Sequence, residues 1–254
     1  QGGADAFVGL VGLGTATRGG VGVITGSSSL HLAVAPAPSK GPPKGAPGVW
    51  GPYRGAPLAD LAMSEGGQST TGAALQWARR IFGDASFDDL EAEAAQLPVG
   101  AEGCAALETF QGARTPETDP KARGALYGLT LKHGRGHIWR ALLEATALGT
   151  RASVDALTQG SQAKEDLALS GGATRSKLWL QMHADACGRD VVVCVAVKFQ
   201  AATGGSGVCY VSVHDNEGTS CAIDKHVSEE NAKLQRSKTL NRRGANICRG
   251  GGGG

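Results

Sequence analysis

The sequence predicts an α/β fold, and three stretches of it support that prediction. Residues 166–195 combine a short apolar strand, a Gly-Gly turn, a helix and a second buried strand, an order typical of α/β domains. Residues 21–25 and 30–34 are apolar and β-branched on either side of a small polar turn, which predicts a hairpin. Residues 137–157 carry apolar side chains at helical spacing and predict the longest helix.

Two shorter helices are expected between the hairpin and the long helix. Residues 69–82 predict one, with an apolar stripe made of Ala74, Trp77, Ala78 and Ile81. A second helix starts at Ser86, whose hydroxyl can cap the amide of Asp89 while the Asp89 side chain returns the bond. Residues 36–57 are rich in proline and predict an irregular surface loop.

The remaining helix boundaries follow from capping residues and apolar spacing. After the Gly-Gly turn, Thr174 is expected to cap a helix that Gly188 ends. That helix should direct Leu178, Met182 and Ala186 inward. The apolar face of the long helix should consist of Ile138, Leu142, Ala145, Leu148 and Ala152.

Composition excludes several classes of protein. The chain has 254 residues, of which 41% are hydrophobic, enough to bury the core of one large domain or two small ones. Its 40 glycines follow no G-X-Y period, which excludes collagen. No apolar run approaches the roughly 20 residues that cross a bilayer, so no membrane segment is expected. A formal net charge of +2 is too small to indicate a nucleic-acid or membrane partner.

The cysteines indicate the cellular compartment of the protein, and the sequences at the two ends of the chain predict how each end is organised. Six cysteines without a C-x-x-C pair predict reduced thiols in a cytoplasmic protein rather than a zinc site. The N-terminus has neither an initiator methionine nor the features of a signal or transit peptide, so we expect the chain to begin within a longer protein. Residues 199–254 contain glycine clusters and end in a basic stretch, and we expect them to be disordered rather than to bind nucleic acid.

Several residues could carry chemistry, and each has a structural alternative. Asp5, between glycines at an expected helix start, is a helix N-cap or a general base. The turn Thr25-Gly26-Ser27-Ser28 suits a phosphate or is a plain hairpin turn. Gly171-Gly172 allow a ligand to approach the backbone or allow close packing of helix and strand. His133 and His137 have a metal-compatible spacing without the intervening glutamate of a metalloprotease, so no metal site is expected.

Taken together and in order, six segments resemble the C-terminal lobe of FGGY-type carbohydrate kinases. The segments are Gly3–Ala6, Ile24–Ser28, Glu65–Gly72, Phe110–Pro116, Ala122–Thr130 and Ser170–Ser176. The glutamate segment and the Arg-Thr-Pro run are similar to the ribulokinase-like branch. The resemblance covers residues 1 to about 193. The sequence after Val193 departs from the family pattern, and we interpret it as a reading-frame or splicing artefact.

The resemblance implies an actin-like, ribonuclease-H-like ATPase lobe at residues 1–198, followed by an unrelated tail at 199–254. It implies ATP with Mg²⁺, and transfer of the γ-phosphoryl group to a hydroxyl of a sugar or polyol, with a pentulose such as ribulose favoured. The family's N-terminal lobe is absent from this chain, so the chain is expected to be inactive alone. The alternative is a non-catalytic module that keeps the fold and binds a nucleotide or a partner.

The same resemblance implies roles for individual residues. Asp5 matches the family's catalytic base and would also contact the sugar. Glu65 falls at the position of a sugar-contacting glutamate. The residues that match the family's nucleotide site are Thr25, Gly26, Ser27, Ser28, Gly112, Gly171, Gly172 and Ala173.

Overall fold

A computed structural model describes residues 9–10, 13, 15, 19–36, 46–56, 58–158, 166–197, 207–213 and 222–223. Residues 194–197, 207–213 and 222–223 are described by their backbone alone. Asp5 lies outside the described residues.

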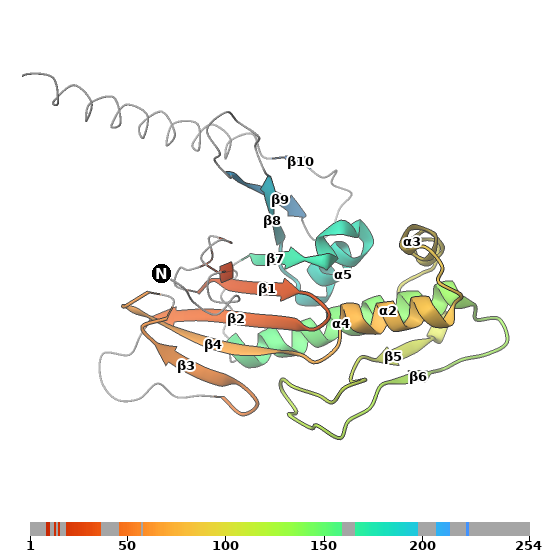
Figure 1. The fold of residues 1–254 in the computed structure, drawn as a ribbon, viewed down its shortest axis with the longest axis horizontal. Coiled ribbons are helices and arrows are strands. Elements are labelled where there is room, and N and C mark those ends of the chain that lie inside the picture. Colours follow the sequence, from red (N-terminus) through yellow and green to blue (C-terminus); the bar gives the residue numbers. More distant parts are fainter. Residues whose placement is uncertain are drawn as a thin grey trace, which may run out of the picture.

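In this described part, one mixed sheet of eight strands has the order β10-β9-β8-β7-β1-β2-β4-β3 (Figure 1). Strand β1 pairs in parallel with β7 and antiparallel with β2, and β7 pairs in parallel with β8. The strands are β1 (Val21–Thr25), β2 (Ser29–Pro36), β3 (Trp50–Arg54), β4 (Leu61–Gln68), β7 (Leu167–Gly171), β8 (Val191–Val197), β9 (Gly207–Val213) and β10 (Ala222–Ile223).

The helices gather at one end of this sheet. Figure 1 shows α2, α3 and α5 beside the end where β1 turns into β2, with the long helix α4 running along the sheet. A small second sheet pairs β5 with β6. The bounds are α2 (Gly72–Ile81), α3 (Phe87–Ala95), α4 (Arg135–Thr158), α5 (Lys177–Cys187), β5 (Ala105–Leu107) and β6 (Ala125–Tyr127). Single 3-10 turns span Ala101–Gly103 and Gly172–Arg175.

The two faces of the sheet bury separate groups of side chains. Alternate residues of β2 point to opposite faces, as the pleat of a strand requires. Ala33 packs in the main core with α4 and α5, whereas Leu32 and Val34 pack with Leu10 and Met63 in a second cluster. The site described below therefore rests on the face that α4 and α5 cover.

The structure confirms the predicted α/β fold, the hairpin, the four helices and the strands near 167–171 and 191–197. Ser86 caps α3 as predicted, because its hydroxyl accepts a hydrogen bond from the Asp89 amide at 3.0 Å. Gly188 ends α5 in the left-handed conformation, with φ of 59°.

Other predictions are wrong. Ser176 rather than Thr174 caps α5. Ile81, Leu148 and Ala152 are exposed, although the sequence predicts all three on buried faces. The proline-rich stretch contains the edge strand β3, where proline is tolerated since an outer strand leaves half its backbone unpaired.

Within the predicted tail, the described backbone forms two strands: β9 pairs with β8, and β10 pairs with β9. None of the helices in the described ranges is both long enough and apolar enough to span a membrane.

Candidate functional site

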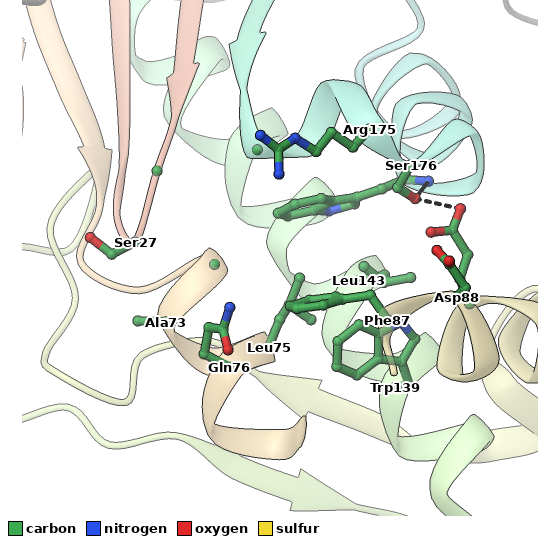
Figure 2. A pocket seen from close by; sticks show the side chains of 15 residues that line it. Ser27, Ala73, Leu75, Gln76, Phe87, Asp88, Trp139, Leu143, Arg175 and Ser176 are labelled. Atoms are coloured by element: carbon green, nitrogen blue, oxygen red, sulfur yellow. Dashed lines mark hydrogen bonds between the residues drawn. The ribbon is translucent and has the colours of Figure 1, made fainter. Parts of the chain in front are cut away.

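A cavity of about 560 Å³ opens at the end of the sheet where β1 and β7 stop. The β1–β2 turn, helices α2, α3, α4 and α5 and the 3-10 turn after β7 all contribute to its walls. Figure 2 shows Ser27 and Ala73 on one side of the cavity, and Phe87, Trp139 and Asp88 on the other. The two sides differ in chemistry: the first is mostly backbone and the second is mostly apolar.

The backbone side is built on the β1–β2 turn, which helix α2 holds in place. The amides of Thr71, Gly72 and Ala73 donate to the carbonyl oxygens of Gly26 and Ser27, with distances of 2.9 to 3.1 Å. A Cβ at Gly72 would lie 2.5 Å from the Gly26 oxygen, so only glycine permits this contact. The first amides of α2 therefore fix the turn.

Strand β7 ends beside the same turn. Gly171 pairs with Thr25 in parallel register and has φ of +96°, in a region that glycine alone adopts easily. The next residue, Gly172, lines the cavity and brings bare backbone to it. The Thr25 hydroxyl is buried and has no hydrogen-bond partner in the described part of the chain. A buried hydroxyl without a partner is rare in folded proteins.

The apolar side consists of large side chains from four helices. Trp139 of α4 and Trp179 of α5 are almost fully buried, and Phe87 of α3 meets Trp139 edge-on with the ring centroids 5.5 Å apart. Leu75 and Leu143 complete this wall. Flat aromatic surfaces of this kind bind planar apolar groups.

At one edge of the cavity, a polar link joins α3 and α5. Ser176 accepts a hydrogen bond from the Trp179 amide at 3.0 Å and donates to Glu91 at 2.8 Å. Asp88, also on α3, lines the cavity near this link (Figure 2). Arg175, two residues before α5 begins, adds a positive charge to the lining.

The structure brings together only part of the predicted nucleotide site. Gly26, Ser27 and Gly172 line the cavity, and Thr25, Ser28, Gly171 and Ala173 are their neighbours in the chain. Gly112 lies elsewhere. It lines a second, polar hollow of about 20 Å³, together with Gln68, Glu108 and Arg114.

Glu65 lies on β4 and is also outside the cavity lining. Arg114 approaches its carboxylate at 3.5 Å and lies over the Trp50 ring, 4.9 Å from the centroid. Trp50 is the β3 residue directly opposite Glu65. The carboxylate, the guanidinium and the indole thus form one partly exposed cluster.

His133 and His137 are neighbours on the surface, with ring centroids 5.0 Å apart. The nearby Glu102 carboxylate is 2.9 Å from Lys132, and this hydrogen bond holds the pKa of Glu102 below its usual range. Across the described ranges, no three His, Cys, Asp or Glu side chains are arranged to hold a metal ion.

Sequence reasoning missed Phe87, Trp139, Trp179, Arg175, Ser176 and Glu91. The aromatic residues look like ordinary core positions, because a helix stripe that faces a cavity has the same spacing as one that faces a core. No local signal distinguishes the two cases.

The profile of the FGGY family of carbohydrate kinases, C-terminal domain, matches residues 21–211. The chain belongs to the FGGY family of carbohydrate kinases. The match continues past Val193, where the sequence interpretation ended the resemblance, and past residue 198 into β9.

Two relatives of this FGGY chain illustrate the similarity. An FGGY carbohydrate kinase domain-containing protein of Danio rerio is 34% identical over 196 residues, covering 67% of this chain and 35% of the relative. A ribulokinase of Halalkalibacterium halodurans is 30% identical over 213 residues, covering 79% of this chain and 37% of the relative. The FGGY chain thus spans little more than a third of the length of these relatives.

The crystal structure of xylulose kinase from Rhodospirillum rubrum has the same fold. It aligns with a TM-score of 0.62 at 30% identity, covering 76% of this chain and 38% of the kinase. The mixed sheet with its helices is therefore the actin-like ATPase lobe that the sequence predicts.

Proposed function

We propose that this chain is the ATP-binding lobe of a two-lobe carbohydrate kinase. The observation that carries the proposal is the cavity, which has an apolar aromatic wall for a nucleobase and a glycine-rich backbone side for phosphates. Its volume of about 560 Å³ lies within the usual range for nucleotide-sized ligands. Membership of the FGGY family supports a carbohydrate as the phosphoryl acceptor.

The backbone side suits the phosphates of ATP in two respects. Gly26 and Gly172 leave room for bulky anions to approach the main chain, and the Thr25 hydroxyl is a buried donor without a partner in the described residues. Amides and hydroxyls directed at phosphate oxygens stabilise the charge that develops during phosphoryl transfer. We assign Thr25, Gly26, Ser27, Ser28, Gly171, Gly172 and Ala173 to this part of the site, and Gly112 to the smaller hollow.

The reaction requires a base for the acceptor hydroxyl, and we assign that role to Asp5. Its carboxylate takes the proton as the hydroxyl oxygen forms a bond to the γ-phosphorus, and the bond from that phosphorus to the bridging oxygen breaks, which releases ADP. Mg²⁺ bound to ATP would neutralise phosphate charge, and it would take most of its ligands from phosphates and water, so a three-donor protein cluster would not be needed.

We propose a pentulose such as ribulose as the acceptor and Glu65 as one of its contacts. The motif around Glu65 and the ribulokinase among the relatives support this choice. The carboxylate is partly exposed beside Arg114 and Trp50 and can accept hydrogen bonds from sugar hydroxyls.

We further propose that an N-terminal lobe completes the active site and that the protein is cytoplasmic. The chain spans 35% and 37% of two relatives, which supports a second lobe and an inactive isolated chain. Cys104 and Cys187 are free, as expected of cytoplasmic thiols.

Two experiments test the proposal. Calorimetric titration of the chain with ATP should give saturable binding, and the absence of binding would refute the assignment of the cavity.

In a protein joined to the N-terminal lobe, Asp5→Asn should lower the rate of pentulose phosphorylation by about 10² to 10⁴ while ATP binding is kept. Asp84→Asn, at a surface position with positive φ that asparagine tolerates, is the control. Full activity in Asp5→Asn would contradict the role of Asp5.

A further inference from the structure

Thr146 lies on α4 between the cavity and the polar hollow, and it is hydrogen-bonded to a wall of each. Its hydroxyl accepts a hydrogen bond from Nε1 of Trp179 at 2.8 Å, and its carbonyl oxygen accepts one from Nε2 of Gln68 at 3.0 Å. Trp179 lines the cavity and Gln68 lines the hollow, whereas Thr146 lines neither. Thr146 is completely buried.

The bond to Trp179 determines how its indole ring is oriented. The Thr146 hydroxyl donates its own hydrogen to the Leu143 carbonyl at 2.8 Å, so its oxygen is left to accept from Trp179. Nε1–H is the one polar group of an indole, and a buried donor without an acceptor is costly. Rotating the ring away from Thr146 would leave this donor unsatisfied.

The other side of Thr146 is equally constrained. The Gln68 amide also donates to Glu108 at 3.3 Å and accepts from the Thr150 hydroxyl at 3.1 Å. It can approach α4 this closely because Gly149 has no side chain: a Cβ there would lie 2.3 Å from Nε2 of Gln68. The turn of α4 that carries Thr146 is therefore fixed against β4.

We infer that Thr146 is a positioning residue for the nucleotide, since it fixes the Trp179 indole plane that forms the apolar wall of the cavity. The inference rests on the proposed function, because it assumes that the cavity binds a nucleobase. It makes the affinity for ATP depend on a side chain that does not line the cavity.

The test compares two buried threonines of the same helix. Thr146→Val removes the acceptor for Trp179, whereas Thr150→Val removes a hydroxyl that contacts Gln68 and His31 but not Trp179. Both variants lose a buried hydrogen bond and should lose similar stability in urea. Thr146→Val should weaken ATP binding about tenfold, a change that Thr150→Val does not share, and Thr146→Ser should restore it.

A double-mutant cycle shows whether the effect passes through the indole. Trp179→Phe keeps an aromatic ring but removes Nε1–H, so Thr146→Val should cause no further loss of ATP affinity in that background. A full tenfold loss there, or equal weakening by Thr146→Val and Thr150→Val, would overturn the inference.

Nuclear magnetic resonance separates this inference from the proposed function. The chain has four tryptophans, and the indole N–H signal of Trp179 is the one lost in Trp179→Phe. That signal should shift in Thr146→Val and stay in place in Thr150→Val, whether or not ATP binds. An unchanged signal would show that Thr146 does not position the ring, whereas a shifted signal without any ATP binding by the unmodified chain would refute only the nucleotide role.

Discussion

The carbonyl oxygen of Thr25 faces Gly171 so closely across the β1–β7 pair that a Cβ on Gly171 would lie 1.9 Å from it. This contact puts the ends of both strands side by side and places Gly172 at the cavity. Gly171→Ala should therefore separate the strands at the site and weaken ATP binding as well as folding. Urea unfolding and calorimetric titration with ATP measure the two effects.

A matched control for Gly171→Ala is Gly100→Ala. Gly100 also has a positive φ, of 83°, but no atom lies within 4 Å of its Cβ position. Its alanine variant should lose only the cost of a left-handed residue, about 1 to 2 kcal/mol. Equal losses of stability in the two variants would show that the Thr25 contact adds nothing.

The Ser176 side chain links α5 to α3, and removing its hydroxyl should destabilise both helices. Ser176→Ala deletes the N-cap of α5 and leaves Glu91 without its hydroxyl donor. We expect a loss of about 1 kcal/mol in the free energy of unfolding. Thr174→Val is the informative comparison, because the sequence predicts Thr174 as the cap of α5. In the structure, the Thr174 hydroxyl instead donates a hydrogen bond to the Gly171 carbonyl oxygen at 2.8 Å, at an exposed position. A larger loss for Thr174→Val would favour the sequence prediction.

Much of this fold is predictable because its signals are local. The hairpin at Thr25 to Ser29, the cap at Ser86 and the stop at Gly188 each depend on residues that are close together in the chain. Strand β4 (Leu61–Gln68) was not predicted, since its small and polar residues, Ser64 to Gln68, lack the β-branched and aromatic side chains that mark strands. Its pairing with β2 and β3 on both sides compensates for that weak propensity.

The candidate site also contains parts that the sequence predicts and parts that it does not. The β1–β2 turn is recognisable in the sequence by its small polar residues, and the end of β7 is recognisable because the positive φ of Gly171 favours glycine. The aromatic wall is not, since Phe87, Trp139 and Trp179 come from three helices whose packing decides which face borders the cavity. The Thr146–Trp179 bond joins residues 33 positions apart, and no pattern along the chain indicates it.

Phe87 offers a test of the apolar wall with little disturbance of the core, because it is 40% exposed. Phe87→Ala removes a ring that meets Trp139 edge-on and faces the cavity. We expect ATP binding to weaken about three- to tenfold, the usual contribution of one aromatic contact. Tyr127→Ala, which truncates a more exposed aromatic residue outside the cavity lining, should leave the affinity unchanged. Unaltered binding in Phe87→Ala would place the nucleobase elsewhere.

Two buried histidines should make the stability of the chain depend on pH. Burial lowers the pKa of His31 to about 3 and that of His183 to about 4, so both are neutral in the folded protein at pH 5. In the unfolded chain they bind protons below about pH 6.5. Between about pH 6.5 and pH 4, the unfolded state thus binds more protons than the folded state. As the pH falls through this range, the free energy of unfolding should fall by up to about 1.4 kcal/mol per histidine for each pH unit. Urea unfolding at pH 7 and pH 5 measures this slope.

Replacing one of the two histidines isolates its share of the pH dependence. His183→Gln should reduce the slope of unfolding free energy against pH by about half, because one of two depressed groups is lost. The variant also removes the bond from Nδ1 of His183 to the Trp179 carbonyl, at 2.7 Å, and will lower stability at every pH. Met182→Leu controls for that general loss, since it alters the adjacent buried side chain without changing a titrating group. If His183→Gln lowers stability but keeps the full slope, protonation of His183 does not drive the acid sensitivity.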